Sequence, residues 1–175
     1  MIGSILGGIF HRRGYVFAAL LIPAVSGLGF AQDPAEGYWL SVDEKSGKIT
    51  AGWEIYQLDH KLYGKVLSSA EPDQPNRCKE SYRDFPVAGR VNEMPMIGTP
   101  WIFGLSTERP GRWRGGYIID PTTGNLYRCR IIFHGADGNR YKTDTLEMRG
   151  EIVPGIGRSQ FWRRATREIA LSQHS

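Results

Sequence analysis

Hydrophobic and polar residues alternate along most of the chain, in short runs separated by turn residues. A period of two places successive side chains on opposite faces of a strand, so each run predicts a half-buried strand. The predicted strands cover residues 37–42, 48–58, 61–69, 96–108, 112–120, 126–135, 141–152 and 159–165. Only the tail after Thr166 has a mildly helical pattern. Seven or eight short antiparallel strands at regular spacing predict a single all-β domain, either a sandwich or a barrel.

The segments between these runs carry turn chemistry. In Asp120-Pro121-Thr122-Thr123-Gly124-Asn125, proline fixes φ early in the turn and glycine permits a positive φ late in it. Asp120 and Asp137 are therefore expected to cap turns rather than to catalyse a reaction. The pair Gly115-Gly116 predicts a bulge or a close backbone approach, since no helix follows that could complete a phosphate site.

The first 31 residues predict a secretory signal peptide. Arg12 and Arg13 precede a long apolar stretch, and the small residues Gly29 and Ala31 fit a cleavage site before Gln32. An uncleaved membrane anchor is the alternative. The formal net charge of +4 includes both arginines, so the mature chain is nearly neutral. We therefore expect no nucleic-acid partner and, after cleavage, no membrane span.

The two cysteines, Cys78 and Cys129, agree with export. Cys78 lies in the proline-rich loop 70–93 and Cys129 in a predicted strand. An even pair in an oxidising compartment predicts a disulfide, here one that would pin the loop to the sheet, and two free thiols are the alternative. Neither a C-x-x-C motif nor a Cys/His cluster is present in the sequence, so no metal site or cofactor is predicted.

Several sequence blocks occur in a characteristic order: G-x-W, L-Y-G-K-V, W-R-G-G-Y-I-I-D-P-T-T-G-N-L-Y, L-E-M-R-G and G-R-S-Q-F-W-R-R. Over residues 36–164 the chain resembles the exported bacterial family called domain of unknown function 2147. The resemblance implies a location in the periplasm or cell envelope and a lipocalin-like fold, and it implies no reaction. Relatives often carry a second cysteine near the position of Cys78, whereas this chain has Cys129 on a strand.

The two ends of the domain resemble the closure of lipocalin-like (calycin) barrels, in which an arginine of the last strand covers the tryptophan of a G-x-W on the first. Gly37, Trp39 and Arg163 are the residues expected to form this closure, with Phe161 facing the core beside Arg163. The expected fold is thus an antiparallel barrel of about eight strands over residues 32–165, followed by a tail at 166–175. An open β-sandwich is the alternative.

Catalytic motifs are absent from the sequence: there is no G-x-S-x-G elbow, and no catalytic residue is predicted. The expected function is a non-catalytic module that binds a small apolar ligand or a protein partner. The aromatic residues predicted to line a ligand cavity are Tyr56, Tyr63, Trp101, Phe103, Tyr117 and Tyr127. The alternative is a hydrolase with a carboxylate or His134 in a barrel cleft, where His134 would pair with Asp137 or Asp144.

Overall fold

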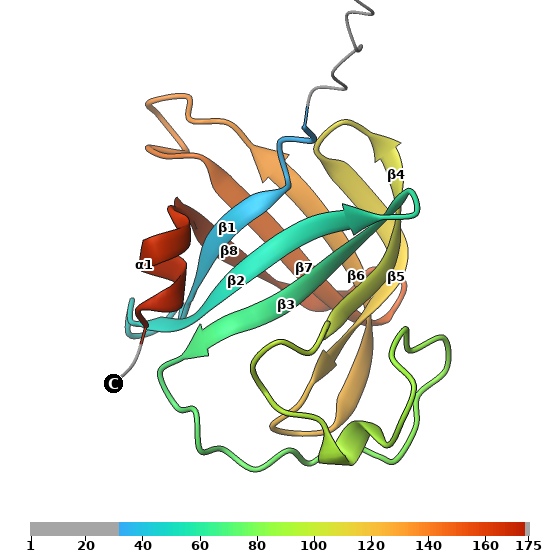
Figure 1. Ribbon diagram of the computed structural model, residues 1–175. Helices are drawn as coiled ribbons and strands as arrows, with labels where there is room; N and C mark the ends of the chain where they lie inside the picture. Colours follow the sequence, from blue (N-terminus) through green and yellow to red (C-terminus); the bar gives the residue numbers. More distant parts are fainter. Residues whose placement is uncertain (1–31, 174–175) are drawn as a thin grey trace, which may run out of the picture. The chain divides into compact units, whose positions relative to one another are not determined.

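Eight antiparallel strands form a closed barrel in the computed structural model, which describes residues 32–173 (Figure 1). The elements are β1 (Gly37–Val42), β2 (Ile49–Leu58), β3 (Lys61–Ser69), the 3₁₀ turn η1 (Val91–Glu93), β4 (Ile102–Arg109), β5 (Arg112–Asp120), β6 (Asn125–His134), β7 (Thr145–Val153), β8 (Ile156–Ala165) and α1 (Arg167–Leu171). Each strand pairs with its neighbours in sequence, and β1 pairs with β8. The barrel prediction is therefore confirmed over the open sandwich. The predicted signal peptide lies outside the described residues.

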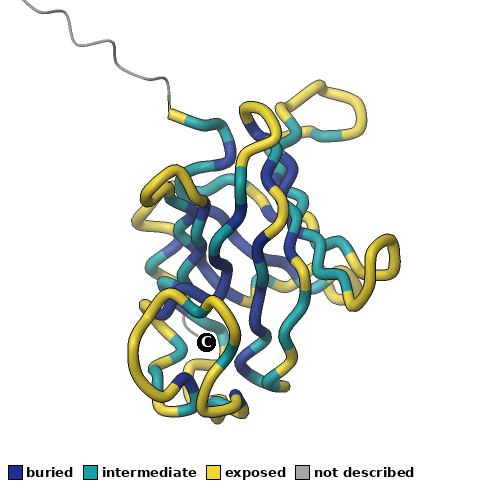
Figure 2. The backbone as a smooth tube through the Cα atoms, turned by 90° about the vertical axis from the view of Figure 1, so that its right-hand side faces the viewer, coloured by how far each residue is buried: buried dark blue, intermediate teal, exposed yellow. Residues whose placement is uncertain are grey.

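Buried residues alternate with partly exposed ones along β3, and the fully exposed residues gather mainly in the loops, as Figure 2 shows. Two predicted strands begin later than expected, since β4 starts at Ile102 and β7 at Thr145. Residues 96–98 instead form a turn, and residues 99–101 have no regular secondary structure. Residues 135–144 form a loop that is held by hydrogen bonds to the carboxylates of Asp137 and Asp144.

Two of the strand pairs are short and lie at the same end of the barrel. β1 pairs with β8 only between Tyr38–Leu40 and Arg163–Ala165. β3 pairs with β4 only through Lys61, Leu62 and Gly64. The barrel wall is therefore continuous at the end where β1 begins, and it can open at the other end, where these strands are not paired.

The continuous end is closed by Trp39, which is fully buried. The guanidinium of Arg164 lies over the ring, and its Nη1 and Nη2 donate hydrogen bonds to the carbonyl oxygens of Glu36 and Pro34 at 2.9 and 2.6 Å. Gly37 has a φ of +119°, and a methyl group there would lie 2.9 Å from Arg164 Nη1. Only glycine suits this close approach.

The prediction that Arg163 covers Trp39 is wrong, and the reason lies in the facing of β8. Trp162 is 1% exposed and faces the interior, whereas Phe161 is 39% exposed. Alternation then places Arg164 inside with Trp162 and turns Arg163 outward. Phe161 and Trp162 are adjacent, and both are bulky and apolar. The alternation pattern of β8 therefore does not reveal which of the two faces the core.

The predicted disulfide is also wrong, because Cys78 and Cys129 are both free and buried. Cys78 lies beside the β5–β6 turn, where a methyl group on Gly124 would be 3.4 Å from the Cys78 Cα. Cys129 lies five residues further along, roughly 16 Å away at about 3.3 Å per residue. A disulfide needs Cα atoms within about 7 Å.

The long loop is nevertheless tied to the barrel, by hydrogen bonds. Arg77 N donates to the carbonyl oxygen of Pro121 at 2.8 Å, and Tyr82 Oη donates to that of Gly124 at 2.7 Å. Asn76 Nδ2 donates to the carbonyl oxygens of Val91 and Met94 and so closes the loop on itself. The β5–β6 hairpin thus serves as the docking point that the disulfide was expected to provide.

The predicted turn roles are confirmed. The Asp120 carboxylate accepts hydrogen bonds from the backbone and hydroxyl of Thr122, and Asp137 accepts from the backbone of Asn139 and Tyr141. The β5 register shifts before Gly116, where a methyl group would lie 2.3 Å from the Phe103 carbonyl oxygen. The glycine pair therefore permits both a bulge and a close approach to β4.

The short helix α1 covers the outside of the barrel at β1–β3 (Figure 1). Ser68 Oγ donates to the Ala170 carbonyl oxygen, which lies so close to Gly52 that no side chain fits there. Between residues 32 and 173, no helix reaches the length and apolar character needed to span a bilayer.

Candidate functional site

A cavity of about 800 Å³ opens at the end of the barrel opposite Trp39. Its walls come from β1–β3 on one side and β5–β8 on the other, and residues of the long loop contribute to its rim. The cavity occupies the region where β1 and β8 no longer pair. Because these strands pair only at the closed end of the barrel, the wall is open at the opposite end, and the cavity lies there.

The base of the cavity is aromatic. The rings of Trp53 on β2 and Trp162 on β8 stack with centroids 4.8 Å apart and an interplanar angle of 27°. Trp53 Nε1 donates to Ser41 Oγ at 3.2 Å, and Trp162 Nε1 donates to Gln160 Oε1 at 3.1 Å, so both indole N–H groups are satisfied and the rings are held in place. Further apolar lining comes from Ala51, Val66, Ile118, Ile119 and Met148.

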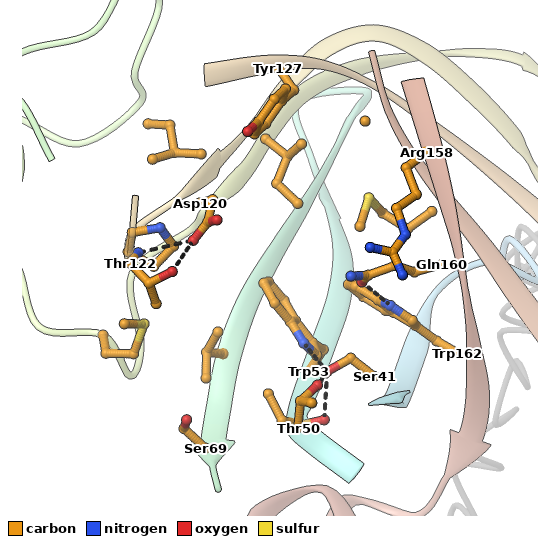
Figure 3. A pocket seen from close by; sticks show the side chains of 18 of the residues that line it. Ser41, Thr50, Trp53, Ser69, Asp120, Thr122, Tyr127, Arg158, Gln160 and Trp162 are labelled. Atoms are coloured by element: carbon orange, nitrogen blue, oxygen red, sulfur yellow. Dashed lines mark hydrogen bonds between the residues drawn. The ribbon is translucent and has the colours of Figure 1, made fainter. Parts of the chain in front are cut away.

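Polar side chains line the cavity on β1–β3, on β8 and at the β5–β6 turn (Figure 3). Arg158 and Gln160 share the inward face of β8 with Trp162, because they are alternate residues of one strand. Arg158 also forms an ion pair with Glu44 at 2.9 Å, across the unpaired stretch between β1 and β8. Asp120 faces the cavity from the opposite side, in its turn-capping role.

Of the six aromatic residues predicted to line a cavity, only Tyr127 does so. Tyr56 and Tyr63 stack on each other at 5.8 Å, beside Lys65, on the outer face of β2 and β3. Phe103 contacts Tyr117 and Phe85 under the long loop, and Trp101 also packs near Phe85. The prediction is therefore wrong for five residues, which pack against the loop or on the outer wall.

His134 does not line the cavity either, and it pairs with neither Asp137 nor Asp144. Its Nε2 lies 3.0 Å from Glu147 Oε2, and Ser159 Oγ donates to Glu147 Oε1 at 2.7 Å. Burial by itself would raise the pKa of Glu147, but the hydrogen bonds from Ser159 and His134 outweigh it and lower that pKa. Ser159 bonds the carboxylate rather than the imidazole, so the three residues are not arranged as a catalytic triad.

Neither the cavity nor the outer wall assembles a metal centre in the part of the chain that the structure describes: no three His, Cys, Asp or Glu side chains converge there. The cavity instead offers an apolar base with a few polar groups above it. Such an arrangement suits reversible binding of a small molecule.

Residues 37–164 match the family described as "Uncharacterized protein conserved in bacteria (DUF2147)". The chain belongs to this family. Among solved structures, the chain is similar to Helicobacter pylori protein HP1028, which is described as belonging to the lipocalin family. The TM-score is 0.59 at 14% identity, covering 77% of this chain and 85% of that one, which supports the lipocalin-like fold. A search of curated proteins finds no match.

The last sequence block that resembles DUF2147, G-R-x-Q-x-W-x-R, lies on β8 and alternates inward and outward side chains. Its side chains Arg158, Gln160, Trp162 and Arg164 all lie on the inward face of β8. The first three line the cavity, and the fourth closes the far end over Trp39. Sequence reasoning missed Arg158, Gln160 and Trp53 as site residues, and the spacing of this block was the signal that could have indicated the first two.

Proposed function

We propose that this DUF2147 protein is a non-catalytic binding protein of the bacterial cell envelope, which holds a small, largely apolar ligand in its open barrel. The observation that carries the proposal is the cavity of about 800 Å³ above the Trp53–Trp162 stack. Its volume lies in the range of small-molecule sites. A barrel filled by side chains would instead have favoured a structural or protein-binding role.

The lining supports binding through burial of apolar surface. Trp53, Val66, Ile118 and Met148 present apolar groups to the cavity from four different strands. A ligand that covers them gains about 25 cal/mol for each Å² of apolar surface removed from water. Because the two indoles are already fixed by hydrogen bonds, little side-chain ordering opposes this gain.

The ligand can be tested with an uncharged fluorescent probe, N-phenyl-1-naphthylamine. Ala51 lies on the cavity wall, so Ala51→Trp places a ring in the space that the ligand would occupy. We expect this variant to lose most probe binding. Lys65→Trp adds the same ring on the outer face of β3 and should bind the probe like the unaltered protein. Equal binding by both variants, or none by the unaltered protein, would contradict the proposal.

Native mass spectrometry on protein taken from its own cell envelope addresses the physiological ligand. We expect a small apolar molecule to be retained by the native protein and to be lost from Ala51→Trp. The export part of the proposal rests on residues 1–31 and is tested on the same material. N-terminal sequencing should begin at Gln32, and a protein that still begins at Met1 would contradict cleavage.

A further inference from the structure

We propose that Arg158 and Gln160 bind a carboxylate, so that the ligand is an amphipathic acid with its charged end at the mouth of the barrel and its apolar part above the tryptophans. This inference rests on the proposed function, because it assigns the chemical class of the ligand in the same cavity. The observation behind it is that two hydrogen-bond donors in the cavity lining have no acceptor within the described residues.

The inward face of β8 runs from the mouth to the base of the cavity. Arg158 lies at the rim, where its side chain is 63% exposed, and Trp162 lies at the base, where it is 1% exposed. Gln160 lies between them (Figure 3). Arg158 pairs across the sheet with Gly150, which has no side chain, so the neighbouring strand leaves room beside the guanidinium.

The Gln160 amide has a fixed orientation. The indole N–H of Trp162 can only donate, so the amide atom that it contacts must be the oxygen, Oε1. The NH₂ group is thereby turned away from the indole, and among residues 32–173 it has no hydrogen-bond partner. Arg158 uses Nε and Nη2 for Glu44, which leaves Nη1 without a partner in the same part of the chain.

Several acceptors of the cavity, in contrast, already accept hydrogen bonds within the protein. The Asp120 carboxylate accepts three hydrogen bonds from Thr122 and Thr123. Glu71 accepts a hydrogen bond from Gln74, and Ser41 Oγ accepts one from Trp53. A ligand that enters therefore meets two open donors, Arg158 Nη1 and the Gln160 NH₂ group. It must bring acceptor atoms of its own, and a cationic guanidinium favours a negatively charged acceptor.

Glu44 marks where the carboxylate of the ligand would bind. Its Oε2 accepts hydrogen bonds from both Nε and Nη2 of Arg158, so a carboxylate already lies beside the guanidinium. The two side chains are 39% and 63% exposed, and exposed ion pairs of this kind contribute little stability. Glu44 can therefore be displaced by the ligand, or it can share the guanidinium with it, and its charge should weaken binding of an acid.

The test compares three probes with the same ten-carbon chain, decanoate, 1-decanol and decyltrimethylammonium, by displacement of N-phenyl-1-naphthylamine at neutral pH. The unaltered protein should bind decanoate at least about tenfold more tightly than decanol, as expected for a charge-assisted hydrogen bond, and the ammonium probe most weakly. Arg158→Met should lose this preference, so that the ratio of its affinities for decanoate and decanol falls to about one. Arg163→Met, which alters an outward arginine of the same strand, should behave like the unaltered protein.

Two further variants separate charge from shape. Glu44→Gln should bind decanoate several-fold more tightly and decanol equally well. Gln160→Leu should weaken decanoate more than decanol. Equal affinity for all three probes, or a preference for the ammonium, would overturn the carboxylate assignment and leave the apolar binding function standing. Failure of every probe, including the naphthylamine, would instead overturn the proposed function itself.

Discussion

The guanidinium of Arg164 lies 4.1 Å from the centre of the Trp39 ring and joins the last strand of the barrel to the first. The same guanidinium donates two hydrogen bonds to backbone carbonyls that precede β1. The N-terminal segment is anchored further by Asp33, whose carboxylate accepts hydrogen bonds from the backbone of Gly111 and the indole of Trp113. This closed end holds the two sides of the barrel together while the other end stays open.

Removing either member of this pair should destabilise the protein. Trp39→Ala should cost about 3–5 kcal/mol, as the truncation of a fully buried aromatic residue. Arg164→Ala should cost about 2–3 kcal/mol, because it removes the contact with the ring and two charge-assisted hydrogen bonds. Arg163→Ala is the control and should change the free energy of unfolding by less than about 0.5 kcal/mol. Urea unfolding measures all three, and equal losses for the two arginines would contradict the assignment.

Gly124 should tolerate alanine much less well than Gly138. Both have a positive φ, +73° and +71°, so both variants should lose about 1–2 kcal/mol from backbone strain. A methyl group on Gly124 would also lie 2.3 Å from the Arg77 carbonyl oxygen, whereas nothing lies within 4 Å of one on Gly138. Gly124→Ala should therefore release the long loop and make residues 70–93 sensitive to protease. Similar proteolysis of the two variants would show that the loop is not held at this turn.

Both thiols should be free and slow to react. Denatured, unreduced protein should yield two reactive thiols per chain in a titration with a thiol reagent, since Cys78 and Cys129 are free. Burial raises the pKa of both thiols, most strongly that of Cys129, so the native protein should hold almost no thiolate near neutral pH. Native reaction rates should therefore rise only when the pH exceeds the ordinary thiol range. A count of zero in the denatured protein would restore the disulfide.

Glu147 should contribute stability that is lost in acid. Its pKa is lowered in the folded protein, so its carboxylate favours folding above the ordinary value of 4.5, and this contribution disappears as the pH falls through the lowered pKa. Glu147→Gln should lose about 1–2 kcal/mol at pH 7 and less near pH 3. Glu93→Gln, at a side chain that is 61% exposed, is the control and should show little effect at either pH. An equal loss at both pH values would mean that only the shape of the side chain matters.

The sequence predicted most of the elements because they depend on local chemistry. Period-two alternation located all eight strands, and the Asp120 and Asp137 turns follow from residues that bond to their own neighbours. The glycine pair Gly115-Gly116 predicted a close approach of two backbone segments, since only glycine leaves the space for one. These features need no knowledge of what lies across the barrel.

The site was harder to predict, as Tyr56 and Tyr127 illustrate. Both are tyrosines in alternating strands, yet Tyr56 stacks on the outer wall and Tyr127 lines the cavity. Aromatic residues on the outside are buried here by the long loop and by one another, so burial on its own does not identify the interior. Where part of the outer face of a barrel is covered, the strands below the cover carry apolar residues on both their inner and their outer faces.

The sequence by itself thus determined the strands and the turns, since alternation and turn residues act over a few positions along the chain, and the resemblance to a known family added the expectation of a lipocalin-like barrel. Only the tertiary structure decided that Arg164 rather than Arg163 covers Trp39, that the thiols stay apart, and that Arg158 and Gln160 face an open cavity. The first and last of these outcomes depend on which face of β8 turns inward and on where its pairing with β1 ends, and β1 and β8 lie more than a hundred positions apart in the sequence. The thiols stay apart because the long loop binds at the β5–β6 turn, which is also distant in the sequence.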